Sequence, residues 1–102
     1  MVNMMKLMQQ AASMQKNIQK LQADLNEREF EFTSGGGAVK CVMKGDMTLS
    51  SIKIDPKAVD PGDVEMLEDL VTTAVNGVLE ATRTSVQQEM SKITGGMTLP
   101  GM

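Results

Sequence analysis

Apolar residues recur at alternating steps of three and four through the first quarter of the chain. The series runs Met4, Leu7, Ala11, Met14, Ile18, Leu21 and Leu25. This heptad spacing keeps one narrow stripe of an α-helix facing a partner helix, whereas a helix that covers a globular core usually has a wider apolar face. The pattern predicts a projecting helix from about Asn3, its N-cap, to Glu27. Its seam pairs either with the other long helix of the same chain or with a second copy.

The apolar period then changes from that of a helix to that of a strand. Phe30 and Phe32 alternate with glutamates in a first predicted strand, 28–34. A second strand, 38–44, places Val39, Cys41 and Met43 on one face. In a third strand, 47–54, the apolar positions change phase, so we expect a β-bulge near Ser50–Ser51. These strands predict an antiparallel meander with one face that needs cover.

Glycines and prolines mark the connections between these elements. Gly35–Gly37 predicts a flexible connection, and Gly45–Asp46 predicts a two-residue hairpin turn in which the glycine takes a positive φ. Asp55–Pro56 ends the third strand. Beyond it, Asp60 is the expected N-cap of a second long helix and Pro61 its first residue.

The second helix changes character along its length. Its first half has a broad apolar face that we expect to cover the sheet, and its second half thins to Val86, Met90 and Ile93, which we expect to project. Gly95–Gly96 ends it. The prediction is one domain over 1–94, of the α/β class (α+β type), in the order α-β-β-β-α with two long helices. A flexible tail follows over 95–102.

Composition argues against catalysis and against a membrane protein. The 102 residues include no His, Trp or Tyr, so the commonest general base and metal ligand is missing. We therefore expect no enzyme activity, no cofactor and no metal. The single cysteine, Cys41, forms no internal disulfide, and no apolar run is long enough to span a bilayer. These features predict a soluble, cytoplasmic protein.

Three smaller features each allow two interpretations. The glycines at 35–37 suit a phosphate-binding loop or a hairpin, and the strand that follows favours the hairpin. The acidic group Asp60, Asp63, Glu65, Glu68 and Asp69 suits a divalent cation or helix capping, and the absence of EF-hand spacing favours capping. Cys41 suits a redox site or a packed strand position, and its apolar neighbours favour packing.

Charge is distributed unevenly along the chain. The net charge is −3, with +2 over residues 1–57 and −5 over residues 58–102. An acidic protein binds DNA only where its cations gather. The first helix offers Lys6, Lys16 and Lys20 opposite the seam, with Gln9 and Ser13 beside them, and Arg83 and Lys92 extend the set on the second helix. These seven are the candidate DNA-binding residues, although lysines on an amphipathic helix are also typical of a solvated face.

The chain resembles the YbaB/EbfC family of bacterial nucleoid-associated proteins over nearly its whole length. The resemblance lies in the Gln- and Met-rich opening helix, Ile54-Asp55-Pro56, the run Glu65 to Val71, Ala74, Asn76, Gly95-Gly96-Met97 and Leu99-Pro100-Gly101. It implies a homodimer with protruding, tweezer-like helices that binds duplex DNA with little sequence specificity. It also implies a location in the nucleoid.

The function we predict is that of a nucleoid-associated protein whose helical arms bind double-stranded DNA and influence its organisation or access. The expected partners are duplex DNA, a second copy of the chain and DNA-processing proteins. The alternative is a dimeric protein-interaction module, in which the Met-rich heptad helix and the acidic second helix bind a protein partner. The low isoelectric point and the scarcity of arginine favour that alternative.

Overall fold

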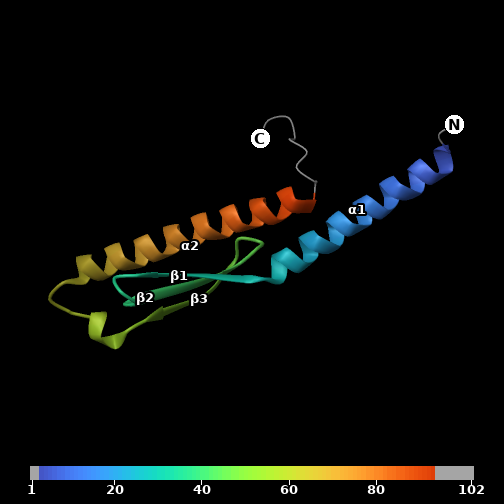
Figure 1. The fold of residues 1–102 in the computed structure, drawn as a ribbon. Coiled ribbons are helices and arrows are strands. Elements are labelled where there is room, and N and C mark those ends of the chain that lie inside the picture. The colour runs from blue at the N-terminus through green and yellow to red at the C-terminus, as the bar shows by residue number, and fades with distance from the viewer. Residues whose placement is uncertain (1–2, 94–102) are drawn as a thin grey trace.

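The computed structural model describes residues 3–93 as one elongated α+β unit, 76 × 23 × 16 Å along its principal axes (Figure 1). Its elements are α1 (Met4–Glu27), β1 (Glu29–Ser34), β2 (Val39–Lys44), β3 (Leu49–Ile54), a short 3₁₀ helix η1 (Pro56–Ala58) and α2 (Val64–Ile93). The strands form an antiparallel meander in the order β1-β2-β3. The predicted order α-β-β-β-α is confirmed. The predicted tail, 95–102, lies outside the described residues.

The first helix begins and ends as the sequence predicts. The Asn3 side-chain oxygen accepts a hydrogen bond from the backbone N–H of Met5 at 3.0 Å, which satisfies one of the free donors at the helix start. At the other end, Arg28 is extended, and its N–H still reaches the carbonyls of Asp24 and Leu25. One residue therefore joins α1 to β1, so the direction of the helix is fixed close to the sheet.

The alternating apolar residues of the three strands point to one face of the sheet, and Val42, paired with Glu31, lies on the other. Phe32 pairs with Cys41, which pairs with Ile52, and residues that pair directly share a face. The register shifts between Val42 and Met43, which pair with Ser51 and Leu49, so Ser50 is the extra residue. The bulge predicted near Ser50–Ser51 is confirmed, and it brings Leu49 into phase with the rest of the apolar face.

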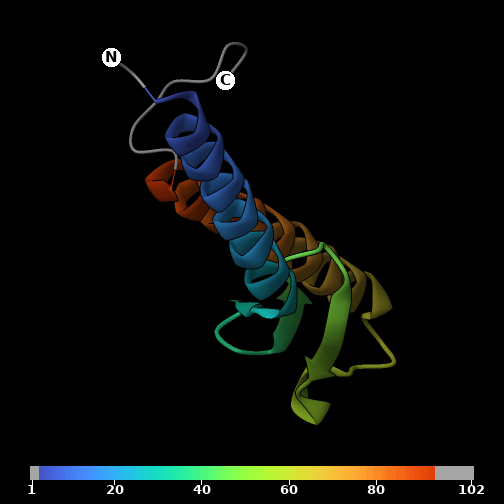
Figure 2. The same ribbon diagram turned by 90° about the vertical axis from the view of Figure 1, so that its right-hand side faces the viewer.

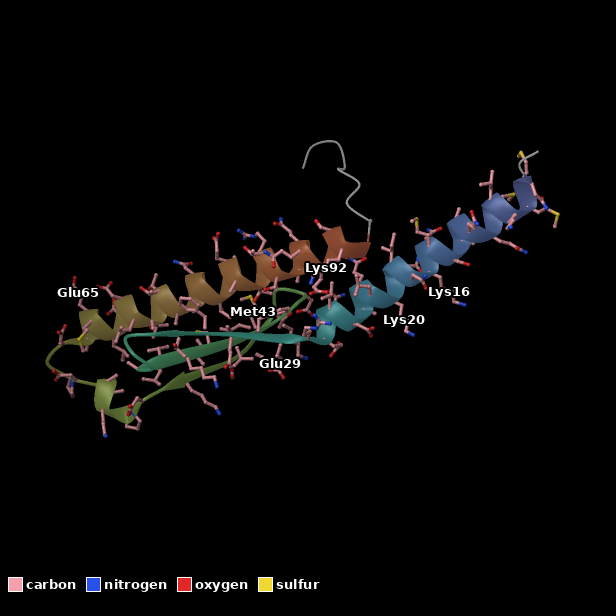
Figure 3. All side chains as sticks on the ribbon, viewed as in Figure 1. Lys16, Lys20, Glu29, Met43, Glu65 and Lys92 are labelled. Atoms are coloured by element: carbon pink, nitrogen blue, oxygen red, sulfur yellow. The ribbon has the colours of Figure 1, made fainter. Side chains whose placement is uncertain are left out.

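The core forms where α2 lies over β1 and β2 (Figure 2). Buried residues from β2 meet α2 there: Val39, Cys41 and Met43 pack with Ala74 and Val78. Figure 3 shows Met43 between the sheet and α2. The Ser34 hydroxyl donates a 2.7 Å hydrogen bond to the Leu70 carbonyl, which fastens the end of β1 to the helix. The broad face of α2 therefore covers β1 and β2, as expected.

The two hairpins differ in which residues have a positive φ. Gly35, Gly36 and Gly37 all have positive φ, a conformation that glycine adopts without steric cost. In the second hairpin the prediction is wrong: the φ of Gly45 is not positive, and Met47 takes that conformation at φ 70°. The connection is longer than two residues and follows the pattern of a turn closed by a left-handed residue. Gly45 is needed instead because it lies against the backbone of Leu25.

The start of α2 also corrects the sequence analysis. The helix begins at Val64, and the Asp63 carboxylate accepts the backbone N–H of Met66 at 3.1 Å, so Asp63 is the N-cap. Asp60 instead closes the preceding turn, accepting the N–H of Gly62 with its side chain and that of Asp63 with its backbone carbonyl. Pro61 lies in that turn, before the helix, because the glycine after it continues the turn.

The second half of α2 was expected to project, but it is packed against other parts of the chain. Thr82 is fully buried there, and Val86 and Met90 are half-buried. The C-terminal part of α1 crosses α2 in this region (Figure 2). This contact holds the base of α1 and leaves the rest of that helix to extend beyond the sheet.

Candidate nucleic-acid interface

The first half of α1 is an arm that extends away from the body of the protein (Figure 1). Along the heptad seam, Leu25 is buried and Ile18 and Leu21 are half-buried, whereas Met4 and Met14 are 74% and 51% exposed. Leu7 and Ala11 are exposed as well. The C-terminal third of the seam therefore packs within the chain, and its N-terminal part is left without cover by the described residues.

A basic stripe runs along this arm. Lys6, Lys16 and Lys20 are exposed, and Gln9 and Ser13 lie exposed between them. Figure 3 shows Lys16 and Lys20 on the side of α1 that is turned away from α2. From Lys6 to Lys20 the stripe covers about 21 Å of helix, because each residue adds about 1.5 Å. The five α1 residues predicted for DNA binding thus lie together on one accessible face.

The charge of the stripe is uncompensated within the described part of the chain. No carboxylate precedes Asp24 in α1. The ion pairs found between described side chains are Lys40–Glu31 at 3.1 Å, Lys44–Glu27 at 3.9 Å and Lys92–Glu89 at 3.4 Å, so none involves an arm lysine. The positive charge of the sheet is therefore partly neutralised, and that of the arm is available to an anionic partner.

A shallow hollow of about 510 Å³ lies on the flank of the arm. Its lining is Lys6, Gln9, Gln10, Ser13, Met14 and Asn17. Amide, hydroxyl and ammonium groups of this kind donate hydrogen bonds to phosphate oxygens without reading base identity. The side chains that line the hollow are therefore suited to contact phosphate groups.

The two candidates on α2 are separate from this stripe. Arg83 is exposed on α2, and Lys92 lies near the end of α2 on the side toward α1 (Figure 3). The ion pair with Glu89, in which Lys92 is 73% exposed, leaves its ammonium group accessible to solvent. The structure therefore brings five of the seven candidates together and places the other two on a different helix.

An uncovered apolar strip borders the core on the β3 side. Leu49, Ile52 and Ile54 share the face that α2 covers elsewhere, yet each remains 38–40% exposed. Val64 and Met66, at the start of α2, are also exposed. The sequence predicted a sheet face that needs cover but not which strand would lack it, since the lateral position of a helix over a sheet does not follow from periodicity.

Other kinds of site find less support in residues 3–93. No three His, Cys, Asp or Glu side chains gather closely enough there to hold a metal ion. Within the same residues, no helix is both long and apolar enough to cross a membrane. Burial raises the pKa of the Cys41 thiol, so this cysteine is held in its less reactive form.

Two exposed methionines of the arm were not among the residues predicted from the sequence. Met5 and Met8 are 71% and 68% exposed near its tip, and both fall outside the heptad series. Their departure from the steps of three and four was the available signal, because a methionine outside the seam has no packing role that the seam explains.

Comparison with known proteins identifies the family. A sequence model of the YbaB/EbfC DNA-binding family matches residues 1–97. The chain belongs to this family. A nucleoid-associated protein from Moorella thermoacetica is 50% identical over 99% of the chain and 97% of its own length. One from Clostridium kluyveri is 48% identical over 98% of the chain and 88% of its own length.

A solved structure supports the fold independently of close sequence similarity. An uncharacterized protein from Helicobacter pylori superposes with a TM-score of 0.73 at 19% identity, covering 92% of this chain and 99% of its own. The arrangement of two long helices about a three-stranded sheet is therefore shared with a distant protein.

Proposed function

We propose that this family member is a nucleoid-associated protein that binds duplex DNA with low sequence specificity through its α1 arms. The observation that carries the proposal is the lysine stripe: three exposed lysines on an arm with no carboxylate before Asp24. The names of the family and of the relatives from Moorella and Clostridium support DNA as the ligand and the nucleoid as the location.

Low specificity follows from the residue types in the stripe. A lysine ammonium is a point charge and does not make the planar, bidentate base contact that arginine makes. Contacts of this kind position a protein on the phosphate backbone but carry no sequence information. Access of other DNA-processing proteins would then change because the duplex is covered, and not because a particular site is blocked.

We further propose that the working form is a homodimer. The uncovered strip of Leu49, Ile52 and Ile54 continues the hydrophobic core to the edge of the body, and a second copy is the occupant that would cover both strips at once. The exposed N-terminal part of the heptad seam gives the arms an apolar side of their own. A dimer doubles the stripe to about six lysines, enough for a marked salt dependence.

The test is fluorescence anisotropy of a labelled mixed-sequence duplex across a salt series. We expect affinity to fall log-linearly with salt, with a slope of about 0.9 per neutralised phosphate. The variant Lys6→Gln/Lys16→Gln/Lys20→Gln should bind every sequence more weakly, by roughly tenfold or more, and with a smaller slope.

The matched control is Lys40→Gln/Lys44→Gln/Lys53→Gln, which removes the same charge from the sheet. Its affinity should stay near that of the unchanged protein. Equal losses in the two triple variants would mean that net charge, and not the arm, decides binding. No binding at low salt would favour the protein-interaction module, and a partner recovered equally well after nuclease treatment would support it.

A further inference from the structure

Met5 lies on the same stripe of α1 as the arm lysines. Residues 5, 9, 13, 16 and 20 follow one another at steps of four, four, three and four, and residues at these steps lie on one side of a helix. The stripe therefore reads, from the tip inward, as methionine, glutamine, serine, lysine and lysine. One long apolar side chain stands at the outer end of a surface that is otherwise polar and basic.

Among the described residues, neither packing nor the seam covers Met5. Its side chain is 71% exposed, and Met8, one helical turn further along, is 68% exposed. Met5 lies away from the seam positions Met4 and Leu7, so a partner arm paired along the seam would leave Met5 uncovered, whereas Met8, four residues after Met4, borders the seam. With Met4 and Leu7, these side chains give the described tip of the arm a contiguous exposed apolar surface, and such a surface indicates a contact site.

We propose that Met5, supported by Met8, is a wedge that inserts between base pairs when the lysine stripe lies along the phosphates. This inference rests on the proposed DNA binding and adds a residue-level mode of contact to it. Methionine suits the role because its side chain is long, unbranched and apolar. The neighbouring Lys6 and Gln9 both lie on the flank of Met5 that faces the lysine stripe, where they would contact phosphates beside the inserted group.

Insertion has a consequence that phosphate contacts alone do not have. An apolar side chain that enters a base step from the minor groove partly unstacks it and kinks the duplex, by about 20–90° in known cases. Flexible pyrimidine–purine steps are kinked most easily. The arm would therefore bend DNA at many sequences, with a mild preference for such steps and no hydrogen-bonded readout of bases.

The experiment measures the bend of a duplex labelled at both ends by resonance energy transfer, at saturating protein. We expect the unchanged protein to shorten the end-to-end distance. Met5→Gln/Met8→Gln should return the distance to that of free DNA, with an affinity loss of less than about tenfold and an unchanged salt slope. Glutamine keeps the length and helix propensity of methionine and removes only its apolar character.

Two controls separate this proposal from its alternatives. Met5→Leu/Met8→Leu keeps an apolar group and should keep the bend, whereas Met47→Gln/Met66→Gln changes two exposed methionines of the body and should have no effect. A double glutamine variant that bends DNA as the unchanged protein does would overturn the wedge. Binding without any bend by the unchanged protein would also overturn it while leaving the proposed function intact. No binding at all would remove both.

Discussion

Gly45 lies against the backbone of Leu25 with no room for a side chain between them. A Cβ on Gly45 would be 2.7 Å from the Leu25 carbonyl carbon and nearer still to its oxygen. The Gly45 N–H also donates to the carbonyl of Arg28 at 2.9 Å. The second hairpin thus presses directly on the last turn of α1.

We expect Gly45→Ala to lower the free energy of unfolding by about 2–3 kcal/mol, because backbone atoms cannot move aside as a flexible side chain can. Urea unfolding followed by circular dichroism measures this change. Gly62→Ala is the matched control: its φ is not positive and its nearest neighbour, an Asp60 carboxylate oxygen, is 3.3 Å away. A cost at Gly62 as large as that at Gly45 would contradict the explanation.

Thr82 offers a substitution that should increase stability. Its side chain is fully buried in α2, and its hydroxyl oxygen has no hydrogen-bond partner in the described part of the chain. Thr82→Val keeps the shape and removes the unsatisfied group, so we expect the free energy of unfolding to rise by about 1 kcal/mol. The exposed Thr72, whose hydroxyl donates to the Glu68 carbonyl, provides the control Thr72→Val, which should gain nothing.

Asp46 should make stability depend on pH in the acid range. Hydrogen bonds from the hydroxyl and the backbone N–H of Thr48 hold the pKa of the Asp46 carboxyl below its ordinary value of 3.8. The carboxyl therefore favours folding above its unfolded pKa, and this contribution is lost as pH falls through the lower folded value. Below pH 3.8, the unfolding free energies of the unchanged protein and of Asp46→Asn should converge. A difference that stays constant from pH 7 to pH 2 would contradict this.

Cys41 should react with thiol reagents only when the protein unfolds. The side chain is fully buried in β2, and burial raises the pKa of its thiol, so both access and thiolate are lacking. We expect a thiol-reactive dye to label the native protein slowly and the urea-unfolded protein rapidly. Fast labelling under native conditions would mean that β2 opens readily.

Periodicity in the sequence predicted which strand residues face the core. The alternation of Phe30 and Phe32, and of Val39, Cys41 and Met43, gave the correct sheet face, and the change of phase before Ile52 located the bulge. These predictions succeed because side-chain direction in strands depends only on position along the chain. The start of α1 after Asn3 follows from local capping, and its end at Glu27 follows from the change of apolar period.

Features that depend on contacts distant in sequence were not predictable. Asp60 was predicted as the N-cap of α2, but it closes the turn before the helix and Asp63 is the cap. Gly45 was expected to supply backbone freedom, but it supplies space beside Leu25, a residue twenty positions earlier. For the candidate site, sequence grouped the arm lysines correctly on one face and could not show that α2 keeps Arg83 and Lys92 apart from them.

Because one extended residue joins α1 to β1, the packing at the base of α1 sets the direction of the whole arm. A helix of 24 residues is about 36 Å long. A change of about 10° in that direction would therefore displace the tip by roughly 6 Å. In the proposed dimer, the distance between the two arm tips would depend on Arg28 and Gly45, which lie at the base of the arm. Substitutions at these two residues would then change the width of duplex that the proposed dimer accepts, without altering a residue proposed to bind DNA.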